Sequence, residues 1–364
     1  MQYLNHVTPN DEGIMSSSDS VSIQNAIDKA IENGINKVII PRYNKRSESF
    51  EWIIDSTVLL PDNIYLVLDN CYMRLADDVF CNMFANKNCR TKIGATKEGT
   101  NRNITIEGMG KAILDGGKYN GMAEFTYDKE NGPHITNNCT LLFSNVEGFV
   151  IKNLHFRNQR YWALDFVFCS NGKISDIDFL ADHTYIDEDG NESYCLSRDL
   201  PRKGVKVQNA DGIDIRSGCH DIIIENITGF TEDDTIALTA LNKGSTLKYM
   251  VDGRDTDIHN IIIRNLMCCS LCAIVRLLNQ GGTKIYNVLI DGIMDTSKDF
   301  EGLDRGYSGV RIGDMEMYGD RHAKSDETYN IVIRNVFART IAPLNIVGEM
   351  SGVSADNIMS FDRK

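Results

Sequence analysis

The chain repeats one short apolar phrase at intervals along most of its length. Each copy holds four or five residues rich in Ile and Val and is ended by Asn or Gly, as at 221–226, 260–265 and 330–335. A β-branched run of this kind predicts a short strand, and the Asn or Gly tolerates the left-handed backbone of a sharp corner. The other copies are at 103–108, 148–153 and 287–292, with a weaker one at 172–176.

The spacing of these phrases distinguishes between β architectures. Successive copies mostly lie one or two units of about 22–27 residues apart, with insertions. A sandwich would show hairpin turns every 8–12 residues, and a propeller would need blades of about 40 residues with their own signature. The repeat therefore predicts an all-β fold, a right-handed parallel β-helix. In this single-stranded solenoid the core is a stack of aliphatic ladders.

The first 40 residues follow a different pattern. Asp19 is placed to cap a helix, Gly34 is placed to end it, and a strand is expected at 37–41. We predict that this α-helix, in a cap of about residues 1–40, covers the open end of the solenoid, because a bare sheet edge invites aggregation. Its apolar face has the spacing of an amphipathic helix and comprises Ile23, Ala26, Ile27, Ala30 and Ile31.

Domain organisation follows from the absence of a linker or a break in composition after this cap. We predict a single parallel β-helix domain over residues 1–364. The clearest insertion is a loop at about 181–202, which contains an acidic turn. Such a loop either walls a groove or is simply solvated.

Charge and composition limit the partners. The sequence has 38 Lys and Arg against 51 Asp and Glu, a net charge of −13, which argues against nucleic acid because phosphate binding depends on Lys and Arg. No window reaches about 18 apolar residues, and no secretion signal is visible, so we expect a cytoplasmic protein with no membrane partner. The ten Cys are scattered, and a lone pair at Cys269 and Cys272 favours buried free thiols over a metal site. No metal and no cofactor are expected, and the oligomeric state stays unknown.

Three carboxylates occupy equivalent positions of neighbouring repeats. Asp211 lies 22 residues, about one repeat, before Asp233, which is followed by Asp234. Equivalent positions of adjacent coils stack about 4.8 Å apart, so these like charges should raise at least one pKa. A general acid and a general base acting on a glycosidic bond need such an arrangement, although stacked turn aspartates would give the same spacing. Asp214, one strand position from an inward Ile, is expected to share the outward face, and Asp165 is another acid on a predicted strand.

The order of the motifs resembles that of the polygalacturonase family, glycoside hydrolase family 28, in the pectin-lyase-like β-helix superfamily. The Asn-Ala-Asp at 209–211 is similar to the family's N-T-D motif, Asp233-Asp234 to its D-D motif, and 308–313 to the segment that carries R-I-K. Weaker similarities in the same order are the N-terminal cap at 19–41, the Gly-rich element at 110–117 and the Trp-containing strand at 157–164.

The resemblance implies inverting hydrolysis in a single displacement. Asp233 would be the general acid, and Asp211 and Asp234 would activate the attacking water. Arg311 would bind a uronate carboxylate, for which the bidentate geometry of Arg is suited. The other candidate substrate-binding residues are Arg276, Asn209, Lys243 and Arg216.

Two positions depart from the family pattern. The His of the family's G-H-G motif should fall near Cys272, and His259 lies too early in the sequence to match. The Lys of R-I-K is Gly313 here. The first departure bears on activity, and the second on whether the sugar is a galacturonate.

The leading prediction is a glycoside hydrolase, polygalacturonase-like, that acts on a plant-cell-wall-type or other oligosaccharide. Exo-action is favoured because a cytoplasmic enzyme would receive short imported fragments. The alternative is a carbohydrate-binding or structural β-helix that has lost catalysis, as in tailspikes or adhesins. A polysaccharide lyase is less favoured, because the acidic cluster has no obvious Arg or Lys base on the same face of the coil.

Overall fold

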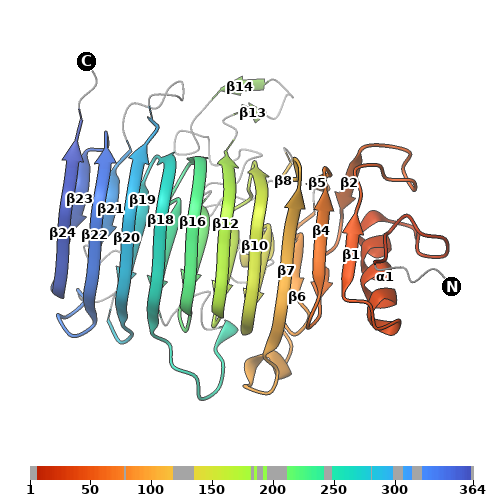
Figure 1. Ribbon diagram of the computed structural model, residues 1–364, viewed down its shortest axis with the longest axis horizontal. Helices are drawn as coiled ribbons and strands as arrows, with labels where there is room; N and C mark the ends of the chain where they lie inside the picture. Colours follow the sequence, from red (N-terminus) through yellow and green to blue (C-terminus); the bar gives the residue numbers. More distant parts are fainter. Residues whose placement is uncertain are drawn as a thin grey trace.

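The computed structural model describes residues 6–77, 79–117, 135–181, 184–186, 192–194, 211–241, 248–279, 281–297, 306–313 and 322–361. The chain forms a right-handed parallel β-helix with one α-helix at its N-terminal end, which confirms the predicted fold class (Figure 1). Two parallel sheets, named the large sheet and the small sheet below, wrap around a common core.

The large sheet contains the repeated phrases. Its main path has the order β1-β4-β7-β10-β12-β16-β18-β20-β22-β24, and β2, β5 and β8 extend it beside this path. The strands are β1 (Lys37–Ile40), β2 (Glu51–Ile54), β4 (Tyr65–Asp69), β5 (Tyr72–Leu75), β7 (Asn101–Met109), β8 (Ile113–Asp115), β10 (Val146–Arg157), β12 (Ser170–Leu180), β16 (His220–Thr231), β18 (Ile258–Ser270), β20 (Ile285–Asp295), β22 (Thr328–Ala338) and β24 (Ser351–Ser360).

The small sheet has shorter strands and the order β23-β21-β19-β17-β15-β11-β9-β6-β3. Its strands are β3 (Val58–Leu60), β6 (Phe84–Asn86), β9 (Leu141–Ser144), β11 (Trp162–Val167), β15 (Asp211–Arg216), β17 (Ile236–Ala240), β19 (Ala273–Asn279), β21 (Ser308–Ile312) and β23 (Ala342–Ile346). Short 3-10 turns, η1 (Ile93–Ala95) and η2 (Ile135–Asn138), lie in connecting segments. A single domain stays our interpretation of these two sheets.

The predicted insertion at 181–202 lies mostly outside the described residues. Its described part contains an antiparallel hairpin of β13 (Thr184–Ile186) and β14 (Glu192–Tyr194). Figure 1 shows this hairpin above the tips of the strands in the middle of the large sheet.

An aliphatic ladder runs through the core, as the repeat predicts. The last apolar residue of each phrase pairs in register with its equivalent on the next strand, and each is fully buried. Burying a side chain of this size stabilises the fold by roughly 1.5–3 kcal/mol. The ladder consists of Ile106, Ile151, Ile174, Ile224, Ile263, Ile290 and Ile333.

The Asn residues that flank the phrases have left-handed backbone, as predicted. In β18, Asn260 has φ 57° and Asn265 has φ 58°. Their amides stack from strand to strand, and Asn287 Nδ2 donates to Asn260 Oδ1 over 3.0 Å. The strands nevertheless continue through these corners, so β18 spans Ile258–Ser270 and is longer than the predicted four or five residues. The amide stacks and the parallel backbone pairing hold the ladder together on both sides of each corner.

The helix α1 (Asp19–Glu32) covers the N-terminal end of the stack (Figure 1). Ile23, Ala26, Ile27 and Ala30 are fully buried, but Ile31 is 45% exposed, so its place on the apolar face was predicted wrongly. In the described chain, no helix combines the length and the apolar composition that a membrane crossing requires.

Ser18, rather than Asp19, caps α1. The Ser18 hydroxyl accepts from the Val21 N–H, whereas Asp19 is the first helical residue. The Asp19 carboxylate accepts from Arg46 Nε (2.6 Å) and from the Ile53 N–H (2.8 Å). Donors from the neighbouring loop and from β2 therefore occupy the carboxylate, and the preceding hydroxyl takes over the cap.

Candidate active site

The predicted acids lie together on the small sheet. Ile213 of β15 pairs with Ile236 of β17, which places Asp211 level with Asp234 on the next strand. The N–H of Gly212 donates to the carbonyl oxygen of Asp234 over 3.0 Å, so the two segments are in direct contact. Residues that are one coil apart in the sequence therefore lie on adjacent strands of one sheet.

Asp234 is held by two donors. Its Oδ1 accepts from the Ala273 N–H over 3.0 Å, and its Oδ2 accepts from the Arg276 guanidinium over 3.3 Å. Asp234 is 2% exposed, so solvent screens its attraction to the Arg276 guanidinium only weakly. These contacts hold the carboxylate in a fixed orientation next to a cation.

Asp233 is more accessible than Asp234 and has a different environment. Its backbone carbonyl accepts from the Ser270 hydroxyl (2.5 Å) and the Thr231 hydroxyl (2.8 Å), which fixes the turn before β17. Its side chain is partly exposed. Burial first, and then the neighbouring Asp234 charge, raise the pKa of Asp233 to about 7. A carboxyl group with this pKa carries a proton for part of the time near neutral pH, as a general acid must.

A cysteine thiol contacts both members of this acid pair. The Cys272 sulfur and one carboxylate oxygen each from Asp233 and Asp234 lie within 4.8 Å of one another. Hydrogen bonding by the thiol lowers the pKa of Asp233, while burial and the two carboxylates raise the pKa of Cys272. Cys272 thus occupies the place near which the family resemblance puts a His.

The same three side chains are close enough to one another to hold a metal ion. Metal ligands must be deprotonated, and a bound cation would itself lower the pKa values of Asp233 and Cys272, which burial raises in its absence. We assign no metal to this group.

Two further carboxyls extend the acidic group along the sheet. Asp165 of β11 pairs with Asp214 of β15, and both are buried. Burial raises the pKa of Asp165 to about 7, against the opposing effects of the Arg216 and Arg90 charges. Burial is also the first cause of the raised pKa of Asp214, and for Asp211 burial is followed by the effect of the Asp233 charge. Asp165 and Asp214 therefore lie side by side on adjacent strands.

Cations lie next to the acids. Arg276 of β19 pairs with Arg311 of β21, so two like charges occupy adjacent rungs on the C-terminal side of Asp234. Arg311 lies over the Tyr307 ring, 5.3 Å from its centroid. On the other side, the Arg216 guanidinium lies over the Trp162 ring, 4.5 Å from its centroid. The same guanidinium lies 3.6 Å from the Asp214 carboxylate.

The two departures from the family pattern have structural counterparts. A Cβ at Gly313, which has φ 78°, would lie 1.8 Å from the carbonyl oxygen of Val347, so this backbone leaves no space for a Lys. His259 lies in the large sheet, where its ring stacks between His220 and Tyr286 at 4.8 and 4.9 Å. It is therefore not part of the acidic group.

Two predicted substrate-binding residues, Asn209 and Lys243, lie outside the described residues. The sequence analysis missed the contact of Cys272 with the acid pair. The signal was available, because Thr231 pairs with Ser270, an offset of 39 residues that also separates Asp233 from Cys272.

Comparison with known protein families identifies the family to which the chain belongs. The model for glycosyl hydrolases family 28 matches residues 53–270, more than half of the chain. The protein therefore belongs to glycosyl hydrolases family 28. A comparison with curated protein sequences found no match.

Solved structures share the fold at low sequence identity. The A-module of mannuronan C-5 epimerase AlgE4 from Azotobacter vinelandii is 14% identical with a TM-score of 0.55, over 96% of this chain and 76% of that one. A hyperthermoactive exopolygalacturonase from Thermotoga maritima is 13% identical with a TM-score of 0.52, over 93% and 88%. A tailspike protein mutant of E. coli bacteriophage HK620, in complex with a pentasaccharide, is 13% identical with a TM-score of 0.53, over 97% and 65%.

Proposed function

We propose that this protein is a glycoside hydrolase that cleaves a glycosidic bond of an oligosaccharide with inversion and acts from a chain end. One observation carries the proposal: a partly exposed carboxyl with a pKa of about 7, on Asp233, adjoins the carboxylate of Asp234, which Arg276 and a backbone N–H hold in place. Environments that separate two neighbouring carboxyls in this way are what acid and base roles require.

The roles follow from these environments. Asp233 donates its proton to the leaving oxygen, because it is the member of the pair that is accessible and protonated near neutrality. Asp234 accepts a proton from the attacking water, with its negative charge held by Arg276. Asp211, one rung away, helps to orient that water. Its own raised pKa leaves Asp234 the stronger candidate for the base.

Arg276 and Arg311 favour a sugar that carries a carboxylate. They occupy adjacent rungs beside the acids, and two guanidinium groups provide planar donors that match a carboxylate. Exo-action, a uronate substrate and a cytoplasmic location are parts of the proposal that activity and localisation measurements have to establish.

The test is the release of sugar from a panel of neutral and acidic oligosaccharides, followed by the variant Asp233→Asn. We expect kcat/KM to fall by roughly 10²–10⁴-fold, the usual effect of losing a general acid. The control is Asp326→Asn, since Asp326 is an exposed acid in a turn distant from the acidic group in the sequence. Unchanged activity of Asp233→Asn would refute the assignment. Product anomers measured by NMR test inversion, and product lengths test exo-action.

A carbohydrate-binding β-helix without catalysis is the second candidate. Cys272 and Gly313, at the places where the family resemblance puts a His and a Lys, favour it. This candidate predicts calorimetric binding of an oligosaccharide by the unaltered protein with no release of sugar. Sugar release that is lost in Asp233→Asn would exclude it.

A further inference from the structure

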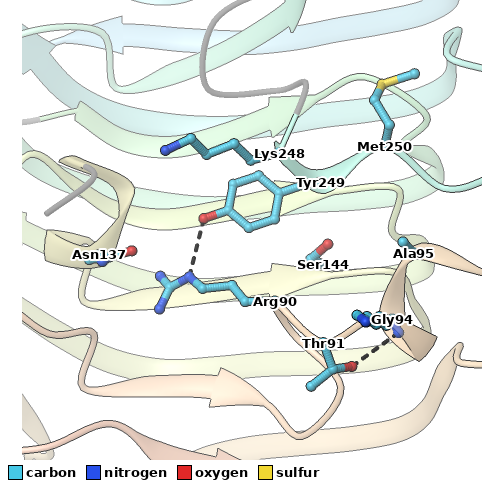
Figure 2. A pocket seen from close by; sticks show the side chains of 10 residues that line it. Arg90, Thr91, Gly94, Ala95, Asn137, Ser144, Lys248, Tyr249 and Met250 are labelled. Atoms are coloured by element: carbon cyan, nitrogen blue, oxygen red, sulfur yellow. Dashed lines mark hydrogen bonds between the residues drawn. The ribbon is translucent and has the colours of Figure 1, made fainter. Parts of the chain in front are cut away.

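A second cavity opens beside the N-terminal half of the small sheet. It has a volume of about 510 Å³, within the range of about 300–1,000 Å³ that is usual for ligand sites. It is lined by Arg90, Thr91, Lys92, Gly94, Ala95, Asn137, Ser144, Lys248, Tyr249 and Met250 (Figure 2). None of the candidate catalytic or substrate-binding residues that the structure describes is among them.

The walls of this cavity are built by segments that are far apart in the sequence. Arg90 Nε donates to the Tyr249 hydroxyl over 3.3 Å, and these residues are 159 positions apart. The Asp252 N–H donates to the Ala95 carbonyl over 2.9 Å, and Asn145 Nδ2 donates to the Gly94 carbonyl over 3.0 Å. A buried apolar cluster supports the walls from beneath: Ala85, Cys89, Leu142, Val167, Phe168, Tyr249 and Val251. The cavity is thus formed before any ligand arrives.

The charge of the cavity is opposite to that of the chain. Among the described residues that line it are three cations, Arg90, Lys92 and Lys248, and no Asp or Glu, although the chain as a whole has a net charge of −13. Within the described chain, no carboxylate lies at ion-pair distance from any of the three. Figure 2 shows the charged ends of Arg90 and Lys248 near the Tyr249 hydroxyl. Thr91, Asn137 and Ser144 add neutral hydrogen-bonding groups, which suit sugar hydroxyls.

The cavity lies on the same sheet as the acids. Ser144 of β9 pairs with Val167 of β11, and the preceding residue, Phe166, pairs with Ile215 of β15. Strand β17, which Asp233 and Asp234 precede, is the next strand in the sheet. Three strand spacings of about 4.8 Å place β9 about 14 Å from β17. The effect of the Arg90 charge on the pKa of Asp165 shows that this cation lies near the acidic group.

We infer that this cavity binds an anionic group on the remote part of the oligosaccharide that the aspartates act on. The inference rests on the proposed function, and it assigns Arg90, Lys92 and Lys248 to a carboxylate, sulfate or phosphate of a sugar several units from the scissile bond. Val167, the partner of Ser144, lies five residues further along β11 than Trp162, the partner of Asp211. The substrate then crosses the small sheet obliquely, with Arg276 and Arg311 on one side of the acids and this cationic cavity on the other.

Binding is measured separately from catalysis by calorimetry on the Asp233→Asn protein. The probes are digalacturonate, pentagalacturonate, the methyl ester of pentagalacturonate, and inorganic phosphate. The cavity variant is the double substitution Lys92→Gln and Lys248→Gln, because both side chains are exposed and neither forms a hydrogen bond to the walls within the described part of the chain. The control is Lys111→Gln and Lys284→Gln, which removes the same charge from exposed lysines outside the cavity.

We expect the cavity variant to bind pentagalacturonate more weakly on the order of tenfold, from two charged contacts of up to about 1 kcal/mol each. The affinity for digalacturonate, which is too short to reach the cavity, should not change. The methyl ester should bind weakly to the Asp233→Asn protein that has no further substitution. The control variant should bind pentagalacturonate with the same affinity as that protein. High salt should reduce the difference between pentamer and dimer.

Three results would overturn the inference. The first is a loss of affinity that is as large for digalacturonate as for pentagalacturonate, or as large in the control variant as in the cavity variant. The second is no binding of pentagalacturonate at all. The third is a cavity that binds phosphate while the affinity for the pentamer is unaffected, which would mark a site for a free anion. Length-dependent binding without hydrolysis by the wild-type protein would instead refute the proposed function and leave the cavity assignment standing.

Discussion

The two sheets have the same spacing between strands, but their outer faces arrange charged side chains differently. On the large sheet, charges alternate from strand to strand. Glu225 lies between Lys173 and Arg264, 2.6 Å from each, and Asp291 lies 2.8 Å from Arg334. On the small sheet like charges are neighbours, with Asp165 beside Asp214 and Arg276 beside Arg311.

The consequences for the carboxyl groups are opposite too. Hydrogen bonds from Lys173 and Arg264 hold the pKa of Glu225 below its ordinary value. Burial and like charge raise the pKa values of Asp211, Asp214 and Asp233 instead. The large sheet shows that this strand spacing allows opposite charges to alternate, so the fold does not require like charges to be neighbours on the small sheet. The grouped charges therefore mark the small sheet as the functional face, at a cost in stability.

The largest expected difference between the faces is in activity. Asp211→Asn should lower kcat/KM by roughly 10²–10⁴-fold, because it removes a carboxyl that orients the attacking water. Glu225→Gln, the matched change on the large sheet, should leave kcat/KM nearly unaltered and cost about 0.2–1 kcal/mol of unfolding free energy. Sugar release and urea unfolding measure the two effects. Equal activity of the two variants would remove the functional distinction between the sheets.

Asp165→Asn tests the stability cost of burying an acid on the small sheet. The pKa of Asp165 is about 7 in the fold and about 3.9 in an unfolded chain. Because the folded-state pKa is the higher one, the free energy of unfolding falls as the pH rises from about 4 to about 7. Above pH 7 the loss is complete. At about 1.4 kcal/mol per pKa unit, it is on the order of 4 kcal/mol at pH 8.

The variant should accordingly gain unfolding free energy relative to the wild type at pH 8 but not at pH 4. Urea unfolding at both values measures the difference, and Asp326→Asn should show none. A gain of the same size at pH 4 would mean that the charge of Asp165 is not the cause.

On the large sheet, the Asn corners should matter for stability alone. Asn265 has φ 58°, so Asn265→Ala should cost about 1–2 kcal/mol, whereas Asn265→Gly should retain more of the stability because Gly has no Cβ. Thermal unfolding compares the two, and kcat/KM should not change in either. Equal destabilisation by Ala and Gly would point to the amide stack with Asn226, rather than to the backbone, as the main contribution.

The smallest expected effect is a shift in the pH profile by Cys272→Ala. The thiol lowers the pKa of Asp233, so its removal should move the alkaline limb of kcat to higher pH. A hydrogen bond contributes about 0.5–1.5 kcal/mol, so the plateau rate should change by less than roughly tenfold. Cys272→Ser keeps a donor and should resemble the wild type. An alkaline limb that does not move in Cys272→Ala would show that the thiol does not act on Asp233.

How much could be predicted differs between the two sheets. The large sheet follows from local pattern, since Ile263 and its equivalents recur with the repeat and each is flanked by Asn or Gly. The adjacency of Asp211 and Asp234 was also predictable, because one coil of chain brings the next strand to a fixed spacing. The cap at Ser18 was not, since the donors that occupy Asp19 come from residues 46 and 53.

The sequence by itself determined the solenoid, its core ladder, the capping helix and the meeting of the three catalytic candidates. Each depends on the period of the chain and on which side chains face inward. Only the tertiary structure decided the rest: that Ser18 rather than Asp19 caps the helix, and that Arg90 and Lys248 share one cavity. These depend on how loops of different length pack against the sheet, and no period in the sequence encodes the distance between side chains that such packing brings together.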